Sequence, residues 1–122
     1  MPATIGREQK SFTHPDDKRS FDKGQIEVID IGEMNIGRST LQPGWKWSNC
    51  VKPIANTEWC EHSHLICQIS GRMRVKMRDG DEFELGPGDV ATIPPGHDAW
   101  VVGNEPAVAL DITGAEHYAK HE

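Results

Sequence analysis

Short runs of alternating apolar and polar residues, separated by glycine and proline, restrict the fold of this chain more than any other feature. The clearest run is RMRVKMR at 72–78, where every second residue is Met or Val and the others are Arg or Lys. Side chains alternate between the two faces of a β-strand, so this run predicts a strand with one buried and one solvated face. The following DGDEFEL predicts a turn and a second strand that places Glu82 and Glu84 opposite the basic side chains.

Other runs of strand length recur along the chain, among them QIEVIDI, MNIGRSTL, VATI, AWVV and AVALDI. We expect about eight strands and no interior helix, because no stretch repeats apolar residues at the helical period. A closed, all-β barrel or sandwich buries both inner sheet faces and leaves few open edges. The expected division is an irregular N-terminal arm or strap over 1–24, a barrel over 25–114 and a C-terminal tail over 115–122.

Length and composition fit a single domain. With 122 residues, of which 36% are hydrophobic and 26% charged, the chain can bury one core. Its formal net charge of −6 argues against nucleic acid and against an anionic membrane surface as partners, because both require a basic face. Small molecules and other protein chains therefore remain as the expected binding partners.

The cysteines and the apolar runs bear on localisation. No apolar run approaches the roughly 18 residues of a membrane span, and the N-terminus lacks the basic-then-apolar order of a signal peptide. Three cysteines without CxxC spacing favour reduced thiols, with a Cys50–Cys60 bridge as the alternative. We therefore expect a cytoplasmic protein.

The segment WCEHSHLICQ places Cys60, His62 and His64 at every second position. On a strand these three side chains share one face, and Gln68 shares it too. That arrangement suits a shared metal ion. It also suits a polar cavity mouth in which the histidines bind water and Gln68 without an ion.

Tryptophans concentrate in PGWKWS, where Trp45 and Trp47 are two residues apart and so face the same side of an extended segment. Their rings can line an apolar ligand pocket or fill the barrel as core residues. Trp100 is assigned to the core, as is usual for a large aromatic side chain.

The stretch GPGDVATIPPGHDAWVVGN resembles the second sequence motif of the cupin superfamily, with Gly88, Pro94 and Gly96 at the family spacing. His62-Ser-His64 resembles the His-x-His of the first motif. The resemblance extends from about residue 41 to 112 and implies a small single-domain protein. The implied fold is a double-stranded β-helix, the cupin or jelly-roll barrel.

Many cupins hold a divalent metal through two histidines and a glutamate of the first motif and one histidine of the second. Counting from His62 and His64 places the glutamate position at Gln68. Counting back from Gly71 instead places the two histidine positions at Glu58 and Cys60, and the glutamate position at His64. These two alignments exclude each other.

In the second motif the family histidine position falls on Ala99, and His97 stands two residues earlier. Two residues restore the same face of a strand, so His97 also points inward. The resemblance thus implies a divalent zinc, iron, nickel or manganese ion. Its predicted ligands are His62, His64 and His97, with Glu58, Cys60 or Gln68 as a further ligand.

Three functions fit these residues, of which the least specific is that of a stabilising subunit with an empty barrel. The first is a metal-dependent oxygenase, isomerase or lyase of the cupin type that acts on a small organic molecule in the barrel. The second is a non-catalytic small-ligand-binding or sensory module with a degenerate metal site. Because cupins commonly pair, the resemblance also implies a homodimer.

Overall fold

The computed structural model describes residues 6–112, so the tail predicted over 115–122 lies outside the described residues. Within this part, nine strands and two one-turn helices follow one another: β1 (Asp17–Phe21), β2 (Gly24–Ile31), β3 (Met34–Leu41), α1 (Trp47–Cys50), α2 (Lys52–Ala55), β4 (His64–Ser70), β5 (Arg72–Met77), β6 (Glu82–Leu85), β7 (Val90–Ile93), β8 (His97–Val102) and β9 (Ala107–Asp111).

Two of these features were not expected. β1 lies inside the predicted N-terminal arm and pairs with β2 in antiparallel register. The helices α1 and α2 have four residues each and follow β3 directly, so the expectation of no interior helix is wrong. A single turn is too short to produce a helical period in the sequence, which explains why the pattern missed both helices.

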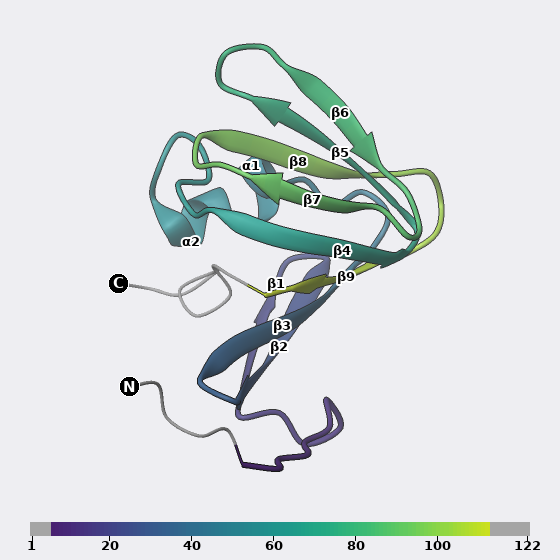
Figure 1. The fold of residues 1–122 in the computed structure, drawn as a ribbon. Helices are drawn as coiled ribbons and strands as arrows, with labels where there is room; N and C mark the ends of the chain where they lie inside the picture. Colours follow the sequence, from purple (N-terminus) through teal and green to yellow (C-terminus); the bar gives the residue numbers. More distant parts are fainter. Residues whose placement is uncertain (1–5, 113–122) are drawn as a thin grey trace.

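The strands form two antiparallel sheets, and the all-β jelly-roll prediction is confirmed. The six-stranded sheet has the order β1-β2-β3-β9-β4-β7, and the three-stranded sheet has the order β6-β5-β8. Figure 1 shows the smaller sheet lying across one part of the larger one, with α1 and α2 at one end. The last strand, β9, lies between β3 and β4, so the chain closes the larger sheet only at its final described strand.

The predicted hairpin at residues 72–85 is confirmed. In the β5–β6 pair, Arg74 lies opposite Glu84 and Lys76 opposite Glu82. Arg74 Nε lies 2.5 Å from a Glu82 carboxylate oxygen, so the two rows of opposite charge contact each other on the solvent side. The alternate residues of β5 face the core, where Val75 is 1% exposed.

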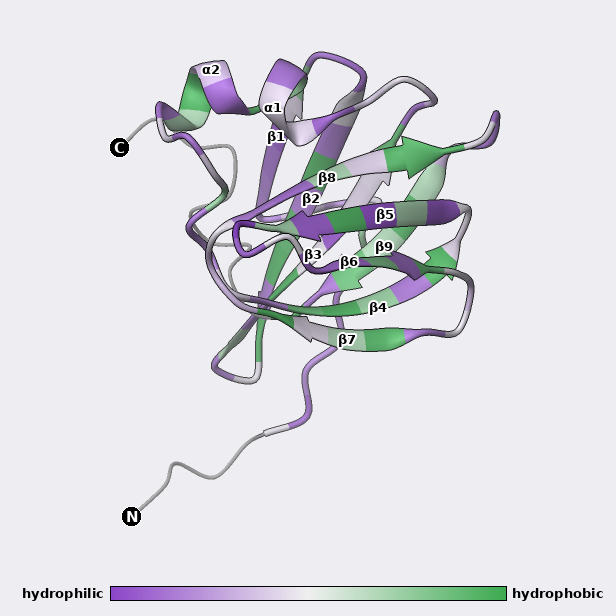
Figure 2. Cartoon of the chain, turned by 90° about the horizontal axis from the view of Figure 1, so that it is seen from above, coloured by the Kyte–Doolittle hydropathy of each residue, from purple (hydrophilic) through white to green (hydrophobic). Residues whose placement is uncertain are grey.

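The core lies between the two sheets, where inward side chains from both meet. In Figure 2, apolar segments run along β4, β7 and β9, whereas apolar and polar residues alternate along β5. Trp45 and Trp47 are each 2% exposed and belong to this core. Trp100 does not: it is half-buried, and the Lys46 ammonium lies 5.3 Å from its ring centre. Because His97 and Val101 face inward on β8, Trp100 between them must face outward, which corrects its core assignment.

Residues of the N-terminal arm before β1 run along the outer side of β2 and β3. The Arg38 guanidinium lies 4.8 Å from the ring centre of Phe12 and donates to Glu27 at 2.9 Å. Asp16 accepts a hydrogen bond from the backbone N–H of Asp30 at 2.8 Å. These contacts hold the arm to the sheet as a strap, away from the barrel interior.

Candidate metal centre

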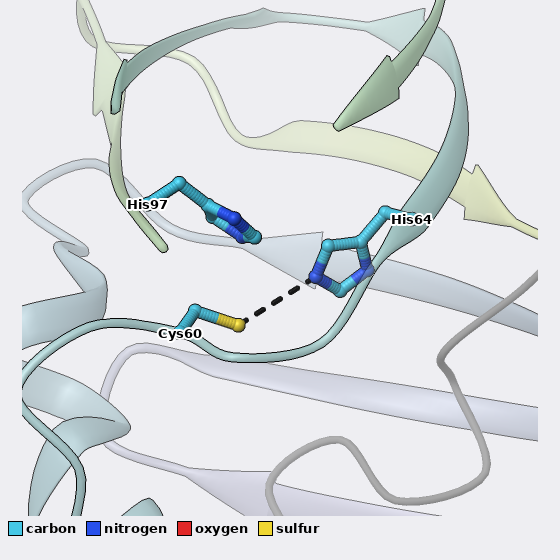
Figure 3. A group of neighbouring side chains, drawn as sticks. All are labelled: Cys60, His64 and His97. Carbon is cyan, nitrogen blue, oxygen red and sulfur yellow. Dashed lines mark hydrogen bonds between the residues drawn. The ribbon is translucent and has the colours of Figure 1, made fainter. Parts of the chain in front are cut away.

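Two segments that are distant in the sequence bring one cysteine and two histidines together at the helical end of the barrel. Cys60 follows α2, His64 is the first residue of β4, and His97 is the first residue of β8. The backbone N–H of Cys60 donates to the carbonyl oxygen of His97 at 2.8 Å, which fixes the two segments side by side. Figure 3 shows the three side chains pointing toward one another.

The donor atoms of Cys60, His64 and His97 all lie within 4.8 Å of one another. Cys60 Sγ lies 3.6 Å from His64 Nε2, and the two imidazole ring centres are 5.0 Å apart. A tetrahedral zinc ion with typical Zn–S and Zn–N bonds separates sulfur from nitrogen by about 3.5 Å. The Cys60–His64 pair already has that separation, so the three donors fit one transition-metal ion after small adjustments.

Both histidines are oriented by a hydrogen bond from the ring nitrogen that points away from the cluster. His64 Nδ1 lies 2.5 Å from a carboxylate oxygen of Asp111, and both side chains are almost fully buried. His97 Nδ1 lies 2.9 Å from the carbonyl oxygen of Pro94, which can only accept, so Nδ1 carries the proton. A neutral His97 therefore presents a bare Nε2, and backing partners of this kind are usual behind metal-binding histidines.

The same contacts set the charge of the cluster. Burial alone raises the pKa of Cys60, but the interactions of the thiol with His64 and His97 outweigh burial and lower the pKa to about 6. Burial likewise lowers the pKa of His64, but the hydrogen bonds to Asp111 and Cys60 prevail and raise it to about 9. Both shifts favour the charged forms, a Cys60 thiolate beside a His64 imidazolium. The thiolate is the form in which cysteine binds metal.

The other predicted ligands lie elsewhere. His62 is half-buried and is not among the clustered donors, because strand β4 begins only at His64 and the alternation assumed for positions 60, 62 and 64 does not hold there. The Glu58 side chain is 79% exposed and pairs with Lys52 at 3.2 Å, outside the barrel. Of the two motif alignments, only the one counted back from Gly71 contains both Cys60 and His64.

Gln68 faces the interior on the same side of β4 as His64 and is 1% exposed. Its side-chain amide donates to the carbonyl oxygen of Ser70 at 2.9 Å, and it is not among the clustered donors. Gln68 therefore lies in the cavity wall beyond the clustered donors.

A cavity of about 80 Å³ opens beside the cluster. Most of its wall is apolar, and no lysine or arginine of the described chain lines it. The predicted pocket residues Trp45 and Trp47 are in this wall. The full lining comprises Ile26, Ser39, Leu41, Trp45, Trp47, His64, Ile66, Gln68, Met73, Val75, Leu85, Ile93, His97, Ala99, Ala107, Ala109 and Asp111.

Asp111 is the site residue that the sequence reasoning missed. It ends β9, where Ala107 and Ala109 also face inward and are buried. A carboxylate at an inward position of an otherwise apolar strand was the available signal, because a buried acid needs a partner. That partner, His64, is 47 positions away in the sequence.

The fold and the site together define a small jelly-roll barrel with a His/Cys cluster inside. Residues 51–113 match the sequence profile of the cupin domain, so this protein belongs to the cupin family and the predicted resemblance is confirmed. No curated protein sequence matches the chain. No helix of the described chain is long and apolar enough to cross a membrane.

Solved structures share the fold at low sequence identity. A protein of unknown function from Rhizobium leguminosarum is 20% identical with a TM-score of 0.65, covering 89% of this chain and 97% of that one. A cupin-like protein from Thermotoga maritima is 17% identical with a TM-score of 0.58, covering 88% and 84%. An oxalate decarboxylase from Lactobacillus farciminis is 20% identical with a TM-score of 0.60, covering 84% of this chain but only 32% of the enzyme, about a third of its length.

Proposed function

We propose that this cupin binds a divalent transition metal through Cys60, His64 and His97, and that the adjoining cavity holds a small organic molecule. The observation that carries the proposal is the convergence of three buried donor atoms within 4.8 Å. Two imidazoles and a thiolate suit zinc, iron or nickel better than a hard cation such as calcium, which prefers oxygen ligands.

The residues around the donors support the same proposal. Asp111 and the Pro94 carbonyl hold the two rings by their outer nitrogens, which leaves an Nε2 atom on each ring to face the cluster. Three protein ligands leave one coordination position for a water or substrate oxygen. When bound there, the ion supplies a Lewis acid that polarises such an oxygen.

A second candidate is a non-catalytic binding or sensory module, and one observation favours it. The acid–base side chains that line the cavity are His64, His97 and Asp111, and all three belong to the metal centre. No other described lining residue is positioned to act as a general base. Binding of a cavity ligand by protein stripped of metal would favour this candidate over the enzyme.

The substrate of the decarboxylase does not carry over to this chain. By its name that enzyme acts on oxalate, which is a dianion at neutral pH. The cavity described above has no lysine or arginine in its lining to balance two negative charges.

Metal analysis tests the proposal directly. Protein purified without added metal or an affinity tag is expected to hold close to one transition-metal ion per chain, measured by inductively coupled plasma mass spectrometry. We expect His97→Ala to retain less than about a tenth of that metal, because an ion with only two protein ligands dissociates during purification.

The matched control is His62→Ala, which removes a histidine of the same segment that lies outside the donor cluster. This variant should keep its metal. An equal loss of metal in His62→Ala and His97→Ala would contradict the Cys60–His64–His97 assignment and support the three-histidine set predicted from the sequence.

We also propose a homodimer formed through the edge of the larger sheet. β7 is the last strand of that sheet and carries Val90, which is 65% exposed, and the neighbouring β4 carries Ile69, which is 49% exposed. An open strand edge beside exposed apolar side chains suits pairing with the same edge of a second copy.

Light scattering is expected to give twice the 13.6 kDa chain mass for the wild-type protein. Val90→Lys should shift the population to monomer, since a charge at an edge strand opposes edge-to-edge pairing. Met34→Lys, an exposed apolar position on β3, is the matched control and should remain dimeric. A monomeric wild-type protein would remove this part of the proposal.

Cytoplasmic localisation is proposed on the state of the cysteines. Cys50, Cys60 and Cys67 are all free thiols, which leaves the Cys50–Cys60 bridge unformed and fits a reducing compartment.

A further inference from the structure

Residues that line the barrel cavity carry most of the buried polar atoms without a hydrogen-bond partner in the described chain. Of four buried side-chain polar atoms without a hydrogen-bond partner among the described residues, three belong to Trp45, Gln68 and Asp111. All three residues line the same cavity. Buried polar atoms are normally paired with protein, water or ligand, because an unmet hydrogen bond costs stability. Their concentration around one cavity indicates that its occupant carries hydrogen-bonding groups at the positions of these residues.

The types of these atoms define the complementary ligand groups. Trp45 Nε1 is a donor and needs an acceptor on the ligand. Gln68 Oε1 and Asp111 Oδ1 are acceptors and need N–H or O–H donors. The Gln68 amide is held by its bond to the Ser70 carbonyl at 2.9 Å, so its oxygen is presented in a fixed direction.

The cavity wall is polar on one side and apolar on the other. In the larger sheet, Ala109 lies opposite Ser39 on one neighbouring strand and opposite Gln68 on the other. The small alanine leaves room between these two polar side chains. The smaller sheet faces them with Met73 and Val75, which are buried apolar residues. A ligand with one polar edge and one apolar edge fits this asymmetry.

Charge and size restrict the ligand further. No lysine or arginine of the described chain lines the cavity. A cavity of about 80 Å³ has room for roughly five to eight non-hydrogen atoms.

We propose that this cavity takes a small neutral molecule with at least one N–H or O–H donor and one acceptor, such as a primary amide or an alcohol, and discriminates against carboxylates of the same size. The proposal rests on the proposed function, since it concerns the same barrel. Gln68 and Trp45 are the residues that determine this specificity, and neither is a proposed metal ligand.

The test uses three probes of equal size: propionamide, propionate and butanone. Their binding is measured by ligand-observed nuclear magnetic resonance titration on the wild-type protein, and metal content is measured on the same samples. Propionamide should bind saturably. Propionate should bind at least about tenfold more weakly, because no lysine or arginine among the described lining residues balances its charge. Butanone should be weaker than propionamide, because it has no donor for Gln68.

Two variants assign the effect to the cavity. Gln68→Leu removes the acceptor at similar size, and Trp45→Phe removes the indole N–H. Each should weaken propionamide binding roughly five- to tenfold, in line with the loss of one hydrogen bond, and should leave metal content unchanged. Gln42→Leu, the same substitution at an exposed position, is the control and should bind propionamide like the wild type.

The outcomes separate this inference from the proposed function. Equal or tighter binding of propionate, or undiminished propionamide binding in both cavity variants, overturns the ligand class. Metal uptake without binding of any probe also overturns it and leaves the metal site standing. Propionamide binding in protein that takes up no metal upholds the ligand class and overturns the metal proposal.

Discussion

Asp111→Asn is expected to weaken metal binding by about 10- to 100-fold while the barrel remains folded. Asparagine keeps the size of the side chain and an oxygen that accepts from His64 Nδ1. It removes the negative charge that lies 2.5 Å from the ring and makes His64 a stronger ligand. Because both side chains are buried, water cannot replace that charge.

Competition with a chromophoric chelator measures the metal affinity, and circular dichroism of the metal-free proteins checks that the variant folds. Asp81→Asn is the matched control, because Asp81 is exposed in the β5–β6 turn and the substitution removes the same charge. An Asp111→Asn protein that binds metal as tightly as Asp81→Asn would exclude a role for Asp111 behind the metal centre.

Gly71→Ala is expected to have the largest effect on stability, a loss of about 2–4 kcal/mol. Gly71 has a φ of +69°, in the left-handed region that favours glycine. A Cβ there would lie 2.2 Å from the Pro106 carbonyl oxygen and 2.7 Å from the Cα of Ala107. Both obstacles are backbone atoms at the start of β9, so relief of the clash requires that the strand carrying Asp111 shift.

Chemical denaturation of the metal-free proteins gives the change in unfolding free energy. The control is Gly80→Ala, where φ is +98° and an added Cβ meets nothing within 4 Å. The free energy of unfolding of this variant should fall by only about 1 kcal/mol, which is the cost of this backbone conformation for a residue other than glycine. Similar losses in both variants would mean that the close approach of Gly71 to Pro106 does not determine stability.

Residue periodicity was sufficient to predict much of the fold. The alternation over 72–78 predicted the strand, its hairpin partner and the opposed charges, because strand parity is a local property. The motif spacing predicted the cupin barrel and the inward direction of His97. The core assignment of Trp100, which was made from its residue type and not from parity, was wrong, because Trp100 lies on the outer face of its strand.

From the sequence alone, the jelly-roll fold could be predicted, and His64 and His97 could be identified as inward-facing metal-ligand candidates. That Cys60 rather than His62 lies beside them became apparent only from the three-dimensional structure, because the backbone before β4 is not a strand and is held instead by its bridge to His97. Only the tertiary structure brought Asp111 to His64, since their contact depends on β9 inserting beside β4. Such long-range pairing leaves no periodic trace in either segment.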